Sequence, residues 1–216
     1  GSQLVAQTVR LKAGESFLDV CAAPGSKATF VAREKAKVER QKDEELNLLV
    51  AGDFYEHRAK NLQANCRRQA AENINILRYD AEKDLPFNEE SFDVVLLDAP
   101  CSGTGTIRHN PEIRYFLQAN DFGALAQKQL TILENASKTV KRGGKLIYST
   151  CSLETEENEA VAGKFLAANS AFRQVSPEIS ERFKTAENFA RTFPPTHKTD
   201  GFFIAVFEKS RVFDKV

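Results

Sequence analysis

Two segments of the chain place a cysteine directly beyond a run of apolar residues. In the first, an apolar run ends at Asp98, and Pro100 and Cys101 follow; in the second, an expected strand at residues 145–149 runs into Thr150 and Cys151. Ligand sites in open α/β sheets lie just past the carboxyl ends of the strands, so an acid and two thiols at such ends indicate chemistry. Alternatively, Cys101 is a small buried side chain that only fills space within a Gly-rich turn.

Thiols and an acid at a nucleotide-like site suit methylation of a cytosine ring. Carbon 5 of cytosine is a poor nucleophile until a thiolate adds at carbon 6, after which it can take a methyl group from S-adenosylmethionine. An acid such as Asp98, hydrogen-bonded to the ring nitrogen, would stabilise the charge that develops on addition. A second group must then help to remove the carbon-5 proton and to release the enzyme.

The attacking thiol must be ionised, and an ordinary cysteine is not. With a pKa near about 8.5 it is only a few per cent thiolate at neutral pH, and half ionisation requires roughly 2 kcal/mol of differential stabilisation. The N-terminus of a following helix would supply under ~1 kcal/mol. We expect Lys27 or an arginine of a nearby loop to supply the rest.

The elements that must position these groups follow from the alternation of apolar runs with helical patterns. Helices are expected at residues 3–11, 28–46, 56–71, 122–141 and 155–168, and residues 177–198 are typical of a loop. Strands are expected at residues 17–20, 48–52, 74–79, 92–97, 145–149, 172–175 and 202–207. This order predicts an α/β fold with a doubly wound, mostly parallel seven-stranded sheet and helices on both faces.

A candidate cofactor loop follows the first strand and precedes a helix, the arrangement that holds nucleotide-like ligands against backbone N–H groups. It has one glycine, and so it is neither a dinucleotide fingerprint nor a Walker loop. The loop residues are Cys21, Ala22, Ala23, Pro24, Gly25, Ser26 and Lys27.

Three acids end three successive strands, namely Asp53, Asp80 and Asp98. Asp53, at the end of the second strand, is placed to bind ribose hydroxyls. Its alternative role is to cap the helix that follows.

Residues 106–118 interleave basic and aromatic side chains in an irregular stretch. Arg108, His109 and Arg114 stand near Tyr115 and Phe116. Such a loop suits phosphate contact and base stacking, and therefore an RNA substrate. The alternative is a surface loop anchored by its aromatic residues.

Bulk properties bound the class of protein. A length of 216 residues suits one domain over residues 1–216, and neither a membrane span nor a signal peptide is present in the sequence. The four cysteines are scattered and form no CxxC pair, which predicts no metal, no disulfide framework and a cytoplasmic location. Thirty basic and thirty acidic residues give a net charge of +0, which argues against a strong general nucleic-acid binder.

Three motifs in this order give a family resemblance. DVCAAPGSK (residues 19–27), LLDAPCSGTGTIRHNPEIR (96–114) and YSTCSLETEENE (148–159) resemble the motifs of the Sun/Fmu family of RNA cytosine-5 methyltransferases, nearest its bacterial branch for small-subunit ribosomal RNA. The likeness extends over residues 2–209. It implies a Rossmann-like class I methyltransferase domain, S-adenosylmethionine as cofactor, and ribosomal RNA as partner before or during subunit assembly. We expect a monomer.

The resemblance also implies roles for individual residues. Residues 21–27 would line the cofactor pocket, Asp53 would hold the ribose, and Asp80 would lie by the adenine. Asp98 would sit between the cofactor and the target base. Cys151 would be the nucleophile, and Cys101 would assist product release.

Some features depart from the family, and other functions remain open. Ser26 replaces a common glycine, and the charged segment before Leu48 is longer than usual. The family carries an upstream RNA-binding domain, and this chain contains no methionine, so we expect a fragment that binds cofactor but holds RNA weakly. One alternative is a methyltransferase for tRNA or another non-ribosomal substrate. Another is a methyltransferase for a small molecule or a protein, which leaves the paired cysteines without a role, and a third is a non-catalytic RNA-binding assembly factor.

Overall fold

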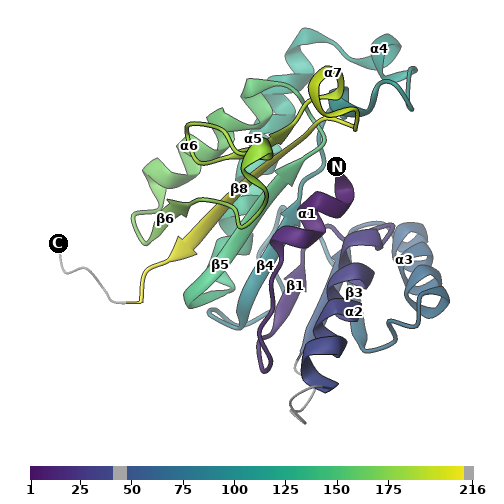
Figure 1. Cartoon of the computed structure of the whole chain (residues 1–216), viewed down its shortest axis with the longest axis vertical. Coiled ribbons are helices and arrows are strands. Elements are labelled where there is room, and N and C mark those ends of the chain that lie inside the picture. The colour runs from purple at the N-terminus through teal and green to yellow at the C-terminus, as the bar shows by residue number, and fades with distance from the viewer. Residues whose placement is uncertain (41–47, 212–216) are drawn as a thin grey trace.

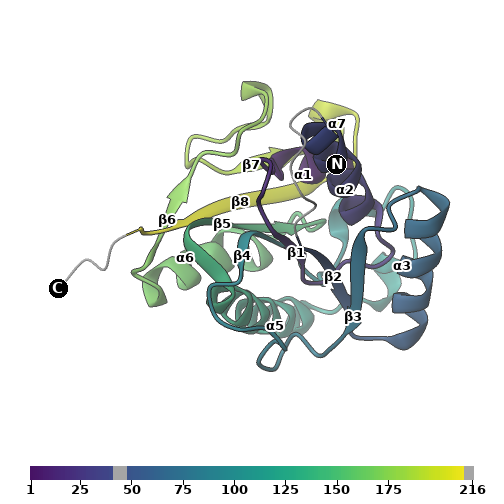
Figure 2. The same cartoon turned by 90° about the horizontal axis from the view of Figure 1, so that it is seen from below.

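The computed structural model describes residues 1–40 and 48–211, and its centre is one mixed sheet (Figure 1). The strands are β1 (Phe17–Asp19), β2 (Leu49–Asp53), β3 (Ile74–Arg78), β4 (Phe92–Asp98), β5 (Val140–Thr150), β6 (Phe172–Val175), β7 (Ala190–Thr192) and β8 (Phe202–Lys209). Their order is β3-β2-β1-β4-β5-β8-β6, and β7 also pairs with β8 (Figure 2).

Strands β1 to β5 run parallel to one another, whereas β8 is antiparallel to β5, β6 and β7. The predicted mostly parallel sheet is confirmed. Because parallel strands end at one edge, the residues that follow β1, β2, β3, β4 and β5 meet there.

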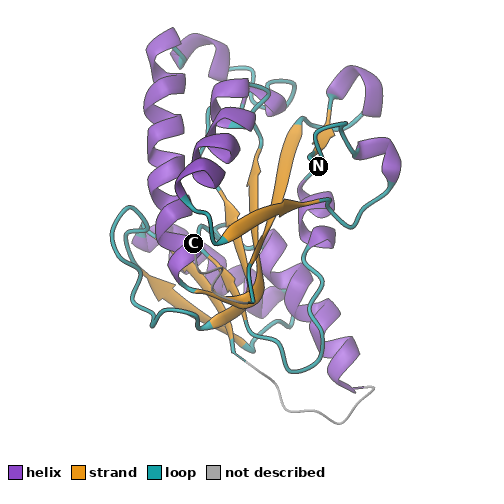
Figure 3. Cartoon of the chain, turned by 90° about the vertical axis from the view of Figure 1, so that its left-hand side faces the viewer, coloured by secondary structure: helices purple, strands orange, loops and turns teal. Residues whose placement is uncertain are grey.

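Helices cover both faces of the sheet, as predicted (Figure 3). The α-helices are α1 (Ser2–Thr8), α2 (Ser26–Arg40), α3 (Glu56–Arg68), α4 (Ile113–Phe116), α5 (Ala119–Lys138), α6 (Glu159–Ala168) and α7 (Pro194–His197). Three short 3₁₀ helices are η1 (Thr104–Thr106), η2 (Thr155–Glu157) and η3 (Glu181–Phe183). No helix within residues 1–40 and 48–211 is long and apolar enough to cross a membrane.

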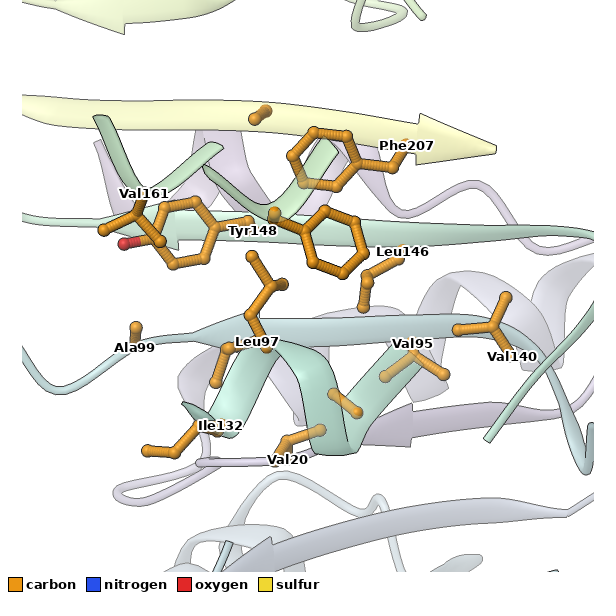
Figure 4. Packing of buried hydrophobic residues seen from close by; sticks show 14 of the residues in the cluster. Val20, Val95, Leu97, Ala99, Ile132, Val140, Leu146, Tyr148, Val161 and Phe207 are labelled. Carbon is orange, nitrogen blue, oxygen red and sulfur yellow. The ribbon is translucent and has the colours of Figure 1, made fainter. Parts of the chain in front are cut away.

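Side chains at alternate positions of each central strand are buried in two different hydrophobic cores. In β4, Leu97 packs with Ile132 of α5 and Val161 of α6, whereas Leu96 belongs to the cluster that contains Val31 of α2 and Leu62 of α3. Figure 4 shows Leu97 beside Tyr148 in the first of these cores. Both leucines are fully buried, which is worth about 1.5–3 kcal/mol each relative to exposure. The buried strand therefore ends in a rigid frame for Asp98 and Cys101.

Two element boundaries differ from the sequence expectation around the fifth strand. Helix α5 ends at Lys138, not 141, and β5 starts at Val140 and continues through Gly143 and Gly144. The pairing with β4 shifts register there, from Phe92↔Val140 to Val94↔Lys145. Gly143 has a φ of 74°, a left-handed conformation that glycine adopts at no steric cost, so the glycines form a bulge within the strand instead of ending the helix.

Other differences lie at short elements. The predicted loop at 177–198 contains η3, β7 and α7, and β7 makes the sheet eight-stranded, one strand more than predicted. The predicted helix at 155–168 is divided at Asn158 into η2 and α6. Helix α2 matches the start of the helix expected at 28–46, of which residues 41–46 lie outside the described residues. Elements of three or four residues are too short to show a hydrophobic period.

Candidate active site

The two cysteines that leave β4 and β5 meet at the carboxyl edge of the sheet. Asp98 pairs with Ser149 in the β4–β5 register, which brings the following loops side by side. The Sγ atoms of Cys101 and Cys151 lie 3.4 Å apart, and the Cys151 backbone N–H donates to Cys101 Sγ at 3.3 Å. The thiols therefore face each other across the junction of two loops, the arrangement that a two-cysteine reaction requires.

Both sulfur-bearing residues line a cavity of about 270 Å³. Small-molecule sites usually measure ~300–1,000 Å³, so this cavity is slightly smaller than that range. The predicted site residues that line it are Cys21, Ala23, Asp53, Asp80, Asp98, Cys101 and Cys151. The structure thus brings together residues from the ends of β1, β2, β3, β4 and β5.

The remaining residues of the predicted cofactor loop shape and support it. Ala22 is buried with the α1, α2 and α3 side chains, and Ser26 begins α2. The Pro24 carbonyl accepts a hydrogen bond from the Asn65 amide at 2.8 Å. Gly25 has a φ of 105°, and a Cβ there would lie 2.5 Å from Leu62 Cδ1, so both the turn and the packing of α3 favour glycine at this position.

A larger groove of about 860 Å³ lies elsewhere, between α1, α2 and residues 178–183. Its walls include Leu4, Phe30 and Phe183, together with charged residues of both signs. We place the candidate site in the smaller cavity because the strand-end acids and both facing thiols line it.

Asp98 is held from two sides. Its Oδ2 lies 2.6 Å from Lys27 Nζ, and its Oδ1 accepts a hydrogen bond from Ser149 Oγ at 2.7 Å. Burial acts to lower the pKa of Lys27, but the ion pair with Asp98 outweighs burial and the pKa is raised. Lys27 therefore stays a cation at the junction of the cofactor loop and β4.

Asp53 and Asp80 occupy different settings along the same edge. Asp53 is buried, accepts hydrogen bonds from the backbone N–H groups of Ala23 and Tyr55 at 3.2 and 3.3 Å, and lies 3.3 Å from Arg58. The helix α3 has Tyr55, not Asp53, at its N-cap, so the capping alternative is wrong. Asp80 accepts a hydrogen bond from the Glu82 N–H at 3.1 Å.

The two thiols have opposite tendencies to ionise. A hydrogen bond from Cys101 lowers the pKa of Cys151, and Lys27 adds to this effect against burial and Asp98. The same hydrogen bond, together with burial, raises the pKa of Cys101. Cys151 is therefore the more readily ionised of the two thiols, and Cys101 is the one that better keeps its proton. Lys27 was expected to help, but the S–H of Cys101 was not, because a sequence does not show that the two sulfurs touch.

Asp19 was overlooked as a candidate site residue. Burial raises its pKa to about 7, and neither of its carboxylate oxygens has a hydrogen-bond partner of good geometry within the described part of the chain. It ends β1 as Asp53 ends β2 and Asp98 ends β4. The sequence places Asp19 inside the strand expected at residues 17–20, and only the observed end of β1 at Asp19 gives it the same strand-end position as the other acids.

The basic and aromatic loop lies around α4, at the same end of the molecule as α7 (Figure 1). Arg108 Nε and His109 Nε2 lie 2.6 and 3.5 Å from Asp200 Oδ1. Arg114 Nε donates to the Pro111 carbonyl, and its guanidinium lies 5.7 Å from the centre of the Tyr115 ring. Tyr115 and Phe116 are 79% and 77% exposed, so they do not anchor the loop to the described fold.

Within residues 1–40 and 48–211, no group of three or more His, Cys, Asp or Glu side chains is arranged to hold a metal ion. The four cysteines in that part of the chain are free thiols. Burial raises the pKa of Cys21 and of Cys66, and these two therefore stay neutral.

Comparisons with known proteins agree on one family. The family described as 16S rRNA methyltransferase RsmB/F matches residues 6–208. Ribosomal RNA small subunit methyltransferase F of Shewanella loihica is 35% identical over 90% of this chain and 39% of its own length. The probable ribosomal RNA small subunit methyltransferase B of Bacillus subtilis is 35% identical over 96% of this chain and 46% of its own length. The chain thus spans less than half the length of these curated relatives.

Solved structures share both the fold and part of the sequence. The crystal structure of PH0851 superimposes with a TM-score of 0.87 at 34% identity, over 96% of this chain and 45% of that chain. The structure of NSun6 from Pyrococcus horikoshii with SFG has a TM-score of 0.82 at 29% identity, over 96% of this chain and 51% of that one. A SAM-dependent methyltransferase from Aquifex aeolicus, at 14% identity and a TM-score of 0.58, shares the Rossmann-like fold.

Proposed function

Since the chain belongs to the 16S rRNA methyltransferase RsmB/F family, we propose that it transfers a methyl group from S-adenosylmethionine to carbon 5 of a cytosine in RNA through a covalent bond from Cys151 to carbon 6. Small-subunit ribosomal RNA is the proposed substrate, since the relatives are named for it. The observation that carries the proposal is the 3.4 Å contact between two cysteine sulfurs that line one cavity with Asp98.

The cavity suits S-adenosylmethionine by charge and by the placement of its acids. The cofactor carries a sulfonium and an ammonium cation, and four carboxylates against two cationic side chains line the cavity. Asp19, buried next to this wall, adds partial negative charge at neutral pH because its pKa is about 7. Asp53 is proposed to hold the ribose and Asp80 to lie by the adenine. When bound, the cofactor supplies an electrophilic methyl group.

Addition to the base would fall to Cys151, because its sulfur is the one that the site stabilises as a thiolate. As the thiolate bonds to carbon 6, charge develops on the ring, and a hydrogen bond from Asp98 to the ring nitrogen would stabilise it. Asp98 can donate that bond only in its protonated form. The Lys27 ammonium, 2.6 Å from Asp98 Oδ2, stays a cation and holds the carboxyl in place, so the proton comes from water. Carbon 5 then becomes nucleophilic enough to accept the methyl group.

Release would fall to Cys101. After the carbon-5 proton has passed to a base, the bond between carbon 6 and Cys151 must break and return the thiolate. Cys101 keeps its proton and lies 3.4 Å from the departing sulfur, so its S–H can stabilise the thiolate as it leaves. Without that donor the covalent protein–RNA adduct should persist.

The RNA itself would be held by the loop around α4. Arg108, His109 and Arg114 are proposed to contact phosphates, and the exposed rings of Tyr115 and Phe116 offer stacking surfaces for unpaired bases. Chemistry on a base requires that it leave the stack, so the target is a loop, a bulge or RNA not yet folded into the subunit. We propose that the chain acts on such RNA in the cytoplasm, before or during subunit assembly, as a monomer.

The facing thiols also separate this proposal from two of its alternatives. A methyltransferase for a small molecule or a protein needs the cofactor cavity but not two sulfurs in contact. A non-catalytic assembly factor needs no thiolate, whereas Cys151 is present and stabilised as one.

The test is incubation with S-adenosylmethionine and unmodified small-subunit ribosomal RNA, followed by mapping of 5-methylcytosine. We expect a modified cytosine with the parent chain and none with Cys151→Ala, whose cofactor affinity should remain within about twofold of the parent. Cys66→Ala, which alters a buried thiol outside the cavity, is the matched control and should retain transfer. Transfer by Cys151→Ala would refute the assignment of the nucleophile.

A further inference from the structure

One buried carboxylate next to the thiols has no part in the mechanism above. Glu157 ends η2 and is 0% exposed, and its neighbour Glu156 is exposed. A carboxylate is almost never fully buried unless it is paired or hydrogen-bonded, because removing its charge from water is costly. The partners of Glu157 therefore show what its burial achieves.

Each of the two cysteines is followed by a serine, and both serines bind Glu157. On Oε1, the carboxylate accepts hydrogen bonds from Ser102 Oγ and from Ser152 Oγ, the latter at 2.7 Å. On Oε2, it accepts the Ser102 backbone N–H at 2.9 Å and Gln129 Nε2 at 2.8 Å. One carboxylate thus connects the loop after β4, the loop after β5 and helix α5.

Further hydrogen bonds hold the turn that carries Glu157 in place. Tyr148 of β5 donates its hydroxyl hydrogen bond to the Glu157 carbonyl, and Gln129 also donates to the Pro100 carbonyl at 3.0 Å. Next to Glu157, the Asn158 side chain donates to the Ser152 carbonyl at 3.0 Å. The short turn before α6 is therefore held against both cysteine loops by groups from the core.

We propose that Glu157 is a positioning residue for the methyl transfer: it ties Ser102 to Ser152 so that the Cys101 and Cys151 sulfurs stay in contact, and its negative charge keeps the proton on Cys101. This inference rests on the proposed function, because the two sulfurs act in that reaction. Glu157 would touch neither cofactor nor base.

The charges around the thiols are consistent with this assignment. The pKa of Cys101 is raised by its hydrogen bond with Cys151 and by burial, and the charge of Glu157 adds to the rise. The pKa of Cys151 is lowered mainly by its hydrogen bond with Cys101, and Lys27 acts in the same direction against burial and Asp98. A negative charge near one thiol and a positive charge near the other place the shared proton on Cys101.

The first readout needs neither RNA nor cofactor. In the parent chain, iodoacetamide at neutral pH should alkylate Cys151 faster than Cys101, as measured by peptide mass spectrometry. Glu157→Gln removes the charge at nearly constant volume, so the preference for Cys151 should fall by at least about threefold. Glu156→Gln removes a charge from the same turn at an exposed position, and the preference should not change. Because no methylation is measured, this result stands apart from the success or failure of the proposed function.

The second readout is the kinetics of transfer. Small misplacements of reacting groups are costly, so Glu157→Gln should lower kcat by about 10- to 100-fold while KM for S-adenosylmethionine stays within about twofold. A change in KM with kcat retained, or an unchanged alkylation preference in a folded Glu157→Gln, would overturn the inference.

A second variant covers the case in which Glu157→Gln does not fold. Ser152→Ala removes the Ser152 hydrogen bond to Glu157, together with the bond that the Glu154 N–H donates to the same hydroxyl, and leaves the carboxylate charged. We expect kcat to fall by roughly 3- to 10-fold, with the alkylation preference for Cys151 retained. An unchanged kcat in Ser152→Ala would then overturn the positioning role.

Discussion

Asp19 carries a stability cost that depends on pH, and Asp19→Asn should relieve it. Burial raises the pKa of Asp19 from an ordinary value of 3.8 to about 7 in the folded chain. The folded state therefore holds the proton more tightly than the unfolded state, and the contribution of Asp19 to stability is lost as the pH rises from about 4 through about 7. An acid whose pKa is lowered in the folded state behaves in the opposite way, because its contribution to stability is lost as the pH falls.

The size of the effect follows from the shift. Each pH unit between the two pKa values costs about 1.4 kcal/mol, so the parent loses roughly 2–3 kcal/mol at Asp19 between pH 5 and pH 8. Asparagine stays neutral over this range. Relative to the parent, Asp19→Asn should gain roughly 2–3 kcal/mol between pH 5 and pH 8, or about 5–10 °C in Tm for a domain of this size.

The assay is thermal unfolding of parent and variant at several pH values between 5 and 8. Asp84→Asn is the control, because an exposed contact with Lys138 lowers the pKa of Asp84 and its difference from the parent should stay flat in this range. A flat difference for Asp19→Asn would mean that Asp19 ionises normally, and the argument from burial would be refuted. The same variant should bind S-adenosylmethionine more weakly, as titration calorimetry would show.

Three further predictions test single contacts. Cys101→Ala removes the S–H that stabilises the Cys151 thiolate. Alkylation of Cys151 at neutral pH should therefore slow by roughly tenfold. An unchanged rate would contradict the assignment of Cys101 as the hydrogen-bond donor. Gly105→Ala would place a Cβ 2.4 Å from the Gly201 carbonyl oxygen and 2.8 Å from that of Cys151. The free energy of unfolding should therefore fall by about 1–3 kcal/mol, and Tm by several degrees. Gly163→Ala in α6 is the control, because its Cβ would meet nothing within 4 Å and should not destabilise the fold. Tyr115→Ala should raise KM for RNA by roughly fivefold or more without affecting cofactor affinity, and an unchanged KM would remove Tyr115 from the RNA surface.

The sequence predicted the frame of the site because that frame depends on long apolar strands. Runs such as residues 94–97 must be buried on both faces, and the acids and thiols that end them must then meet at one edge. The meeting of Asp53, Asp80, Asp98, Cys101 and Cys151 on one cavity follows from this. What such runs cannot show is a three-residue strand such as β7, whose pairing with β8 depends on tertiary contacts.

The details that tune the chemistry came only from the structure. The acids after Ser152 suggest the start of a helix, yet Glu157 turns inward and binds both cysteine loops. The sulfur–sulfur contact joins residues 50 positions apart, and no local pattern encodes its length. Likewise, the pair of glycines at 143 and 144 fits either a helix end or a strand bulge, and only the register with β4 decides between them.

The most direct test of the account is whether the RNA stays covalently bound to the Cys101→Ala variant. We predict that this variant, incubated with S-adenosylmethionine and unmodified small-subunit ribosomal RNA, accumulates a covalent protein–RNA complex whose attached peptide contains Cys151. The double variant Cys101→Ala, Cys151→Ala should form none. Rapid turnover by Cys101→Ala without an adduct, or an adduct attached at any other residue, would contradict the division of labour between the two sulfurs.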